Sequence, residues 1–269
     1  MRRAMRNSVV VTLSVLWFVP TYLLLVNGTT PANKYSGSPQ WLPNGFGLLG
    51  NIESAWSDAN LGPAMLNSLL YALIGGLLAV IVASLAAFAT VVMSVRRRAL
   101  WFWLIYVGTL LPLQVFIQPL YSAYAKTNLY DTQLGLIIIY VAFCIPFAYF
   151  VMRNYLATVP REVTEAARID GASWWRLFWR IHVPLSKSAM VAAFVFQFVA
   201  VWNDLLFGIA LTTSPNIRPV MAALADLQGT YAGTAPPVAL GGALVVSLPT
   251  VILFFVAQRF FVSSLKLNL

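Results

Sequence analysis

The sequence contains few residues that could carry out covalent chemistry. It has one histidine, one cysteine and eight acidic residues among 269. Cys144 lies in an apolar run, where a small core residue is expected, and a single cysteine cannot form a disulfide within the chain. His182 is predicted to be an interfacial loop residue. Without a paired-carboxylate or Ser-His-Asp pattern, or a metal-ligand set, the sequence predicts a protein that is not an enzyme.

Four polar residues inside apolar runs form a second group of interest. Asp204 is the one acid expected well inside such a run, next to Asn203. A carboxylate in a membrane is costly and faces protein or water, so these two residues either line a pathway or cap the packing near the outer end of a helix. Gln114 and Gln118 are four residues apart and share a helical face. They are candidates for the same pathway or for hydrogen bonds between helices.

The composition indicates which elements must position these residues. Hydrophobic residues make up 60% of the chain and charged residues only 9%, whereas soluble domains carry roughly 25% charged residues. A bilayer core requires roughly 20 mostly apolar residues per helix. Six runs satisfy that length, at residues 8–26, 64–95, 99–125, 133–152, 187–212 and 238–258. The chain is therefore predicted to be an all-α membrane protein with about six transmembrane helices.

The basic residues predict the orientation of these helices. If both termini are cytoplasmic and the spans alternate, 14 of the 17 Lys and Arg residues lie inside and three lie outside. The outside residues are Lys34, Lys126 and Arg218. Because short basic loops resist translocation, this asymmetry supports the number of spans and their direction. The net charge of +9 is explained in this way, and nucleic-acid binding is not expected.

The division of the chain follows from the spans. Residues 1–62 would hold the first transmembrane helix and an extracytoplasmic loop, and 27–63 are predicted to be irregular because they are rich in Gly, Pro, Asn and Ser. Residues 63–259 would form the core, with a cytoplasmic loop at about 153–187. Residues 260–269 would be a short cytoplasmic tail.

The loop at 153–187 carries the most specific pattern. Pro160 suits the start of a helix, Glu162 and Glu165 suit its positive end, and Gly171 suits its stop. Small and polar residues fall together on one face by helical spacing, namely Val163, Ala166, Ala167 and Asp170. The small alanines would let another surface approach closely.

A second short helix is predicted after Ser173, which is a suitable N-cap. Trp174, Phe178 and Ile181 would share one face of it, and Arg176 and Arg180 another. Separate aromatic and basic faces are typical of a helix that lies at a membrane surface.

The whole segment resembles the Glu-Ala-Ala loop of permeases from ATP-binding-cassette (ABC) importers. That pattern is E-A-A, three residues, G, nine residues, I, one residue, then L-P. Here Glu165-Ala166-Ala167, Gly171, Ile181 and Val183-Pro184 match every spacing, with Val183 in place of Leu. The form E-A-A-R-I-D-G-A-S is similar to the carbohydrate branch, the maltose-transporter-like permeases. The resemblance covers roughly residues 60–262, but the tail 263–269 lacks that branch's Gly-Ala-Val-Lys-Gly-like ending.

The resemblance implies a fold and a division of labour. The fold would be that of a type I ABC importer permease in a bacterial inner membrane. A second permease subunit would complete the pathway, and an extracytoplasmic solute-binding protein would deliver a sugar or oligosaccharide. Two separate ATPase subunits would bind ATP and Mg, since this chain has no G-x-x-x-x-G-K-[ST] loop and needs no cofactor of its own. Coupling would run through Glu165, Ala166, Ala167, Asp170, Gly171, Ile181 and Pro184.

Two other classes of protein remain to be separated from this one. A proton-coupled carrier needs several intramembrane ionisable residues, and Asp204 alone qualifies here. A membrane enzyme needs a convergent polar site, which the sequence does not indicate. Within the importer class, a permease for phosphate esters would favour Arg or Lys inside the spans, and none is found at mid-depth.

Overall fold

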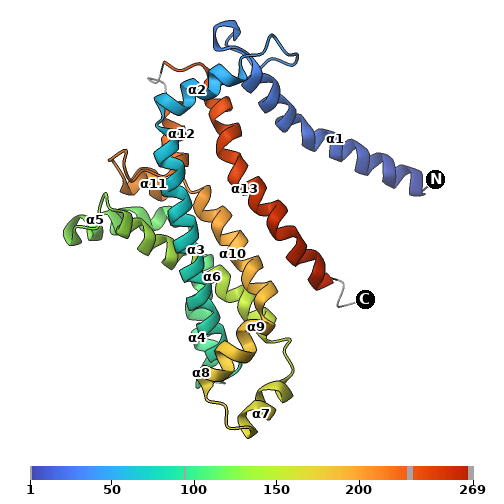
Figure 1. The fold of residues 1–269 in the computed structure, drawn as a ribbon, viewed down its shortest axis with the longest axis vertical. Helices are drawn as coiled ribbons and strands as arrows, with labels where there is room; N and C mark the ends of the chain where they lie inside the picture. The colour runs from blue at the N-terminus through green and yellow to red at the C-terminus, as the bar shows by residue number, and fades with distance from the viewer. Residues whose placement is uncertain (1, 94, 229–232, 266–269) are drawn as a thin grey trace. The chain divides into compact units, whose positions relative to one another are not determined.

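The computed structural model describes residues 2–93, 95–228 and 233–265, so residues 266–269 of the predicted tail 260–269 lie outside the described residues. Within these ranges the chain is helical and contains no strand. The helices are α1 (Arg2–Thr29), η1 (Ala32–Lys34), α2 (Leu48–Asp58), α3 (Leu61–Val91), α4 (Arg98–Tyr106), η2 (Val107–Thr109), η3 (Leu113–Phe116), α5 (Ile117–Thr127), α6 (Gln133–Leu156), α7 (Arg161–Ile169), α8 (Trp174–Leu177), η4 (Phe178–His182), α9 (Val183–Leu185), α10 (Lys187–Trp202), α11 (Leu206–Leu211), α12 (Val220–Asp226) and α13 (Pro236–Leu265) (Figure 1).

The helices fall into two compact units. Unit 1 comprises residues 1–64 and 223–248, and unit 2 comprises residues 65–222 and 249–269. In unit 1, the chain after α1 is held by Asn51, whose side-chain amide donates to the carbonyl oxygens of Gly28 at 2.9 Å and Thr30 at 2.8 Å. The prediction that residues 27–63 are irregular was wrong in part, because α1 continues to Thr29 and Leu48–Asp58 form α2. The prediction gave the surrounding Gly and Pro residues more weight than the apolar side chains that stabilise helix α2.

The core of unit 2 is built on small residues. Ala79, Ala83 and Ala87 are fully buried along α3, where they allow neighbouring helices to come close. Ala83 and Ala87 belong to a cluster with Tyr149 of α6 and Ala193 of α10. The hydroxyls of Thr90 and Tyr149 lie 3.0 Å apart and satisfy each other inside that cluster. Unit 2 is therefore a close-packed bundle of α3, α6 and α10 that carries the cytoplasmic loop between α6 and α10.

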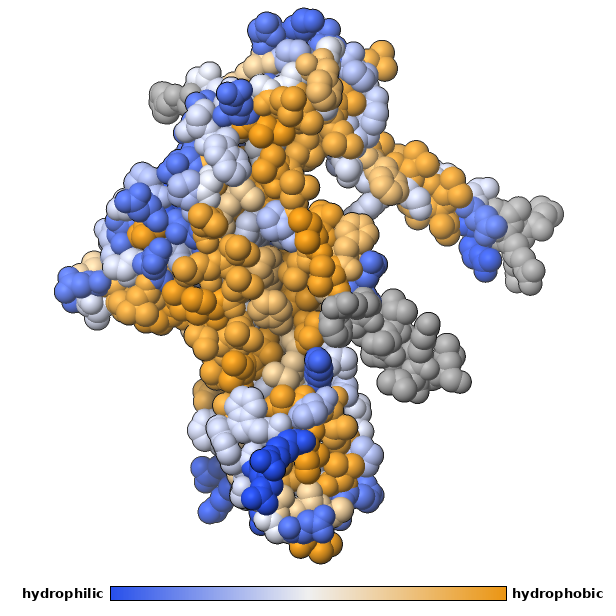
Figure 2. All heavy atoms as spheres, viewed as in Figure 1, coloured by the Kyte–Doolittle hydropathy of each residue, from blue (hydrophilic) through white to orange (hydrophobic). Residues whose placement is uncertain are grey.

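The predicted spans correspond to helices of the structure. Four helices are long and apolar enough to cross a membrane: residues 5–29 of α1, α3, α6 and residues 236–258 of α13. Two bent pairs raise the number to six if each is one span: residues 98–109 with 113–127, and 174–185 with 187–202. The surface agrees with this assignment, since apolar side chains cover the middle of unit 2 in Figure 2.

The predicted span at 99–125 is broken rather than continuous. The helical segments before and after residues 110–112 are bent by 92° to each other. Pro112 is extended, with φ of −62° and ψ of 128°, so it cannot continue the helix. A Cβ atom on Gly108 would lie 2.8 Å from Cγ of Pro146 in α6. The break thus sits against α6 at a point where only glycine allows the contact.

The predicted span at 187–212 also differs from the structure. Helix α10 ends at Trp202, and α11 begins only at Leu206. The backbone of the intervening turn is stabilised by Asp204, whose carboxyl oxygen Oδ2 accepts hydrogen bonds from the backbone N–H groups of Phe207 at 3.1 Å and Gly208 at 3.2 Å. Asp204 therefore starts a new helix, as carboxylates at N-caps do.

Candidate functional site

The Glu-Ala-Ala segment forms a short helix, α7, with a well-defined end. Pro160 precedes its first residue, as predicted. At the other end the N–H of Gly171 donates to the carbonyl of Arg168 at 3.1 Å, and the N–H of Ala172 donates to that of Ala167 at 3.0 Å. These two bonds define a Schellman motif. Gly171 has φ of +77°, a conformation that other residues adopt only with strain. The prediction that Gly171 stops this helix is confirmed.

A second contact fixes the direction in which the chain leaves α7. The guanidinium of Arg168 donates to the carbonyl oxygen of Ala172 at 3.0 Å and lies 4.5 Å from the centre of the Trp174 ring. Ser173 caps α8, because its hydroxyl accepts from the N–H of Arg176 at 3.3 Å. The predicted N-cap is thus confirmed, and Arg168 ties the two helices together.

Helix α7 is joined to the membrane core through η4. Thr164 Oγ1 lies 3.2 Å from Nε2 of His182, and the donor depends on the tautomer of the ring. His182 is 2% exposed, and its ring centre lies 5.1 Å from that of Phe88 in α3. Its carbonyl accepts a hydrogen bond from Ser186, just before α10. The prediction that His182 lies in an interfacial loop was wrong, because this side chain is buried where α3, α7 and η4 meet.

The residues of the Glu-Ala-Ala motif divide between two sides of α7. Glu165, Ala166 and Asp170 are exposed, whereas Ala167 packs against the core of unit 2. The single face predicted for Ala166, Ala167 and Asp170 is therefore split. Within the part of the chain that the structure describes, Asp170 forms no ion pair with Arg168 or Arg176, which leaves it free to contact a residue of a partner protein.

The segment after Ser173 shows its two predicted faces only in part. Phe178 is 3% exposed and Ile181 packs against the core, and Arg176 and Arg180 are exposed, but Trp174 of the predicted apolar face is 37% exposed. The residues Phe178–His182 form a π-helix, which the sequence did not indicate. Pro184 lies in α9 and is exposed. The wider π turn moves His182 inward, which explains why helical spacing alone did not predict its burial.

The two predicted pathway residues that follow α10 have different environments. Asp204 accepts a hydrogen bond from the hydroxyl of Tyr140 at 2.9 Å, in addition to those from the N–H groups of Phe207 and Gly208 in α11. Its carboxyl oxygens are thus engaged by α6 and by the start of α11. Asn203 is exposed, and its amide donates to the carbonyl of Val199 at 2.9 Å within the same helix. Asp204 is therefore engaged within unit 2, and the place of Asn203 and Asp204 in the pathway stays a prediction.

Gln114 and Gln118 both lie beyond the break in the third span. Gln114 is in η3 and Gln118 is in α5, and both side chains are exposed. Neither of them forms a hydrogen bond with Asn203 or Asp204 among the described residues.

A cavity of about 530 Å³ lies beside that break, and the sequence did not indicate it. Three aromatic rings of α6 and α10 contribute to its wall, those of Phe143, Phe147 and Phe196. Gln197 also lines it, and its side chain is only 3% exposed. No other described residue forms a hydrogen bond with that amide. A buried amide without a partner, next to aromatic faces, is suited to binding a polar, uncharged ligand.

Contacts between distant loops support alternate crossing by the spans. Asp131, just before α6, accepts from the N–H groups of Thr213 at 2.7 Å and Ser214 at 2.9 Å. Near the start of α3, Asn67 donates to the carbonyl of Asn216 at 2.8 Å. At the other end of unit 2, side chains from α4, α6 and α7 line one pocket. Residues 213–216, in a loop predicted outside, thus contact the ends of α3 and α6 on the same side. Residues of α4, α6 and α7 predicted at the inside end line one pocket.

Comparisons with known proteins give the family. Residues 75–266 match the family described as the binding-protein-dependent transport system inner membrane component. The osmoprotective compounds uptake permease protein GgtD of Synechocystis sp. is 31% identical and covers 94% of this chain and 87% of its own length. The sn-glycerol-3-phosphate transport system permease protein UgpE of Shigella flexneri is 33% identical and covers 96% of this chain and 94% of its own.

Solved structures agree with this assignment at the level of the fold. A bacterial ABC transporter involved in the import of the acidic polysaccharide alginate has a chain with a TM-score of 0.78, 20% sequence identity and 96% coverage of both chains. The alginate transporter in complex with a pentasaccharide-bound periplasmic protein gives a TM-score of 0.67, 13% identity and coverage of 96% and 94%. The chain therefore has the fold of an ABC importer permease and belongs to the family of binding-protein-dependent transport system inner membrane components.

Proposed function

We propose that this chain is one permease subunit of an ATP-driven sugar importer and that α7 is the helix that couples it to separate ATPase subunits. The observation that carries the proposal is the attachment of α7. It is tied to the rest of unit 2 through Thr164, which lies 3.2 Å from His182, and through Ala167, which packs against the core cluster. A helix held in this way moves with the spans as a rigid body, which is what a lever between two subunits requires.

The exposed side of α7 is the surface that would meet the ATPase. Glu165 and Ala166 have no packing partner within the core, and Glu165 forms no ion pair with a described residue. The carboxylate is therefore available for a charge-assisted hydrogen bond to a partner. ATP and Mg would be bound by the ATPase subunits, because the sequence of this chain has no phosphate-binding loop.

The transport pathway would include the cavity beside the break in the third span. It opens to one side of this chain, so a second permease subunit is needed to close it. Aromatic faces and the unpaired amide of Gln197 match the apolar and polar faces of a neutral sugar. Relatives include a diacetylchitobiose permease from Streptomyces coelicolor and a sn-glycerol-3-phosphate permease. The uncharged lining favours a sugar over a phosphate ester here.

The remaining partners follow from the membrane setting. The excess of basic residues in the loops predicted inside supports cytoplasmic termini for a chain in the plasma membrane of a bacterial cell. The joined loops around Asp131 and Ser214 would then face outward and form part of the surface that receives an extracytoplasmic solute-binding protein. Only 6% of the apolar stretch of α1 is buried, so its side chains would contact lipid or the second permease.

Co-purification tests this proposal. The chain would be expressed with the proteins encoded beside it and isolated in mild detergent. We expect an ATPase with a phosphate-binding loop and a second permease to remain bound, and the ATPase to be lost when residues 160–184 are deleted. Glu165→Lys should weaken ATPase retention, whereas Glu53→Lys, a charge reversal at a residue of α2, should not. Recovery of a stable chain without partners would instead favour a secondary transporter.

A further inference from the structure

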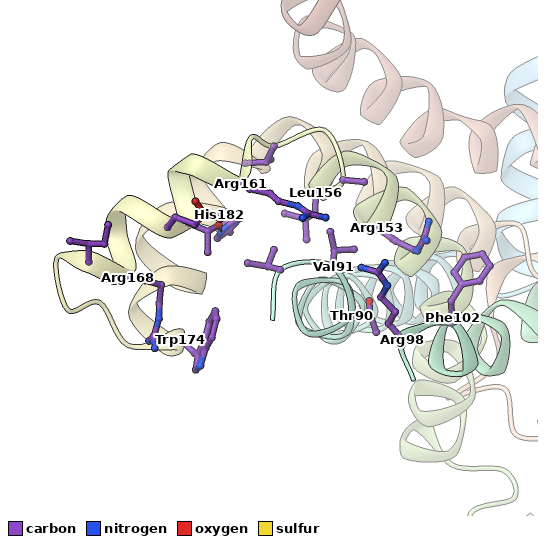
Figure 3. Close-up of a pocket in the computed structure, with 17 residues that line it drawn as sticks. Thr90, Val91, Arg98, Phe102, Arg153, Leu156, Arg161, Arg168, Trp174 and His182 are labelled. Carbon is purple, nitrogen blue, oxygen red and sulfur yellow. Dashed lines mark hydrogen bonds between the residues drawn. The ribbon is translucent and has the colours of Figure 1, made fainter. Parts of the chain in front are cut away.

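The cytoplasmic end of unit 2 contains a pocket of about 800 Å³ with an unusual excess of positive charge. Arg98 of α4, Arg153 of α6, and Arg161 and Arg168 of α7 all line it, against one acid, Glu165. Figure 3 shows Arg98, Arg153 and Arg161 extending toward the same space from their three elements. Like charges gathered around a cavity repel one another unless an anion lies between them.

The protein itself leaves two of these guanidinium groups without a partner. Arg153 lies 4.4 Å from the centre of the Phe102 ring, and Arg168 is held by Ala172 and Trp174. Arg98 and Arg161 form neither an ion pair nor a hydrogen bond with any residue that the structure describes. Two side chains on different helices therefore point at one cavity and have their hydrogen-bond donors unused.

The other lining residues define the kind of ligand. Val91, Phe102 and Leu156 give the pocket an apolar wall at the ends of the spans, and Thr90 and Thr164 add hydroxyl groups. Arginine binds phosphate oxygens through two parallel hydrogen bonds, which makes it the preferred residue for phosphate groups. Basic pockets between helices on the cytoplasmic side of a membrane are suited to anionic lipid headgroups.

We propose that this pocket binds a phosphate group, supplied by an anionic phospholipid or as free phosphate, through Arg98, Arg153 and Arg161. The ligand joins α4 and α6 to the first turn of α7, and so it strengthens the attachment of α7 to the spans. The site depends on the membrane position of these helices and does not require that α7 dock on an ATPase.

The test uses the full chain purified in detergent, alone and with any partner ATPase. Its melting temperature would be measured with added phosphatidylglycerol, phosphatidylcholine or inorganic phosphate. Native mass spectrometry would measure the lipid that it retains under the same conditions. The variant Arg98→Gln/Arg161→Gln removes the two guanidinium groups that lack partners. Its control, Arg96→Gln/Arg180→Gln, removes the same charge from exposed residues outside the pocket.

We expect phosphatidylglycerol to raise the melting temperature of the wild type and the control, and phosphatidylcholine to leave it unchanged. The pocket variant should bind phosphatidylglycerol about tenfold more weakly, because each lost arginine removes a close charge. A response to inorganic phosphate as strong as that to phosphatidylglycerol, and lost in the pocket variant, identifies free phosphate as the source.

Two results would overturn the site. One is an equal response of the pocket variant and the control to both probes. The other is unchanged lipid binding with selective loss of the ATPase in the pocket variant, which would make these arginines part of the ATPase contact. This proposal and the coupling function are tested separately. Deletion of residues 160–184 tests the coupling function through loss of the ATPase, and phosphatidylglycerol binding by the full chain tests the phosphate site.

Discussion

Thr164 Oγ1 and His182 Nε2, 3.2 Å apart, join helix α7 to η4 at the end of the bundle. Because His182 is 2% exposed, removing its partner leaves a buried ring nitrogen unsatisfied. Thr164→Val should lower the free energy of unfolding by about 1–3 kcal/mol and speed amide hydrogen exchange in α7. Thr164→Ser keeps the hydroxyl and should exchange like the wild type. Equal exchange rates in the Val and Ser variants would show that this contact does not hold α7.

Gly171 ends α7 with φ of +77°, while a Cβ atom built there meets nothing within 4 Å. The cost of Gly171→Ala is therefore conformational and should be about 1–2 kcal/mol. Gly50 in α2 has equally open space and no positive φ, so Gly50→Ala should cost nothing or stabilise slightly. Thermal unfolding of the two variants measures the difference. A loss in Gly50→Ala as large as in Gly171→Ala would contradict the role given to the φ angle.

The carboxyl group of Asp204 accepts from the hydroxyl of Tyr140 at 2.9 Å. We expect Tyr140→Phe to destabilise the protein by about 1–3 kcal/mol, since a buried oxygen loses a donor. Transport by the folded fraction should remain, because the Asp204 carboxylate is also engaged by the N–H groups of Phe207 and Gly208. Transport normalised to folded protein would be measured in vesicles. A complete loss of normalised transport would place Asp204 in the pathway.

The hydrogen bonds of Asp131 predict that the stability of the protein depends on pH. Burial opposes ionisation, but hydrogen bonds from Ser214 and Thr213 outweigh it and lower the pKa of Asp131 to about 2. Its unfolded pKa is about 3.9. The ionised form is thus favoured by folding, so its contribution is complete above about pH 4 and is lost as the pH falls toward 2. The melting temperature of Asp131→Asn should fall less than that of the wild type between pH 5 and 3. Parallel curves would refute this.

Gln197 tests the proposed substrate contact. Replacing it with Leu keeps a similar volume and removes the one buried amide that lines the aromatic cavity. If a sugar hydroxyl binds there, Gln197→Leu should raise the KM for uptake about tenfold, with little change in melting temperature. Gln133 lies at the start of α6 outside the cavity, and Gln133→Leu serves as the control. Unchanged uptake kinetics in Gln197→Leu would exclude this contact.

Much of the fold could be predicted because its signals are local. Apolar runs of about 20 residues define α1, α3, α6 and α13, and Pro160, Gly171 and Ser173 define the two short helices of the loop. These elements depend on the hydrophobicity or backbone preference of a few neighbouring residues. The sequence therefore contains nearly all the information that specifies them.

The features that were missed depend on tertiary contacts. The sequence indicated a span at 99–125, but the 92° bend within it brings Gly108 against Pro146, 38 positions further along the chain. The burial of His182 depends on a π-helix, which has no reliable signal in a single sequence. The role of Gln197 depends on three phenylalanines that come from two helices. Periodicity cannot reveal these relationships, because each joins distant parts of the chain.

The most direct test of the central claim is a cross-link from α7. Cys144 is the one cysteine of the sequence and is buried, so a cysteine introduced at the exposed Ala166 can be labelled selectively with a photoreactive group. Lys126→Cys, at the predicted outer end, is the matched control. In membranes containing the whole importer, we predict that Ala166→Cys cross-links to the ATPase subunit and Lys126→Cys does not. An equal or absent ATPase cross-link from both positions would contradict the assignment of α7 as the coupling helix.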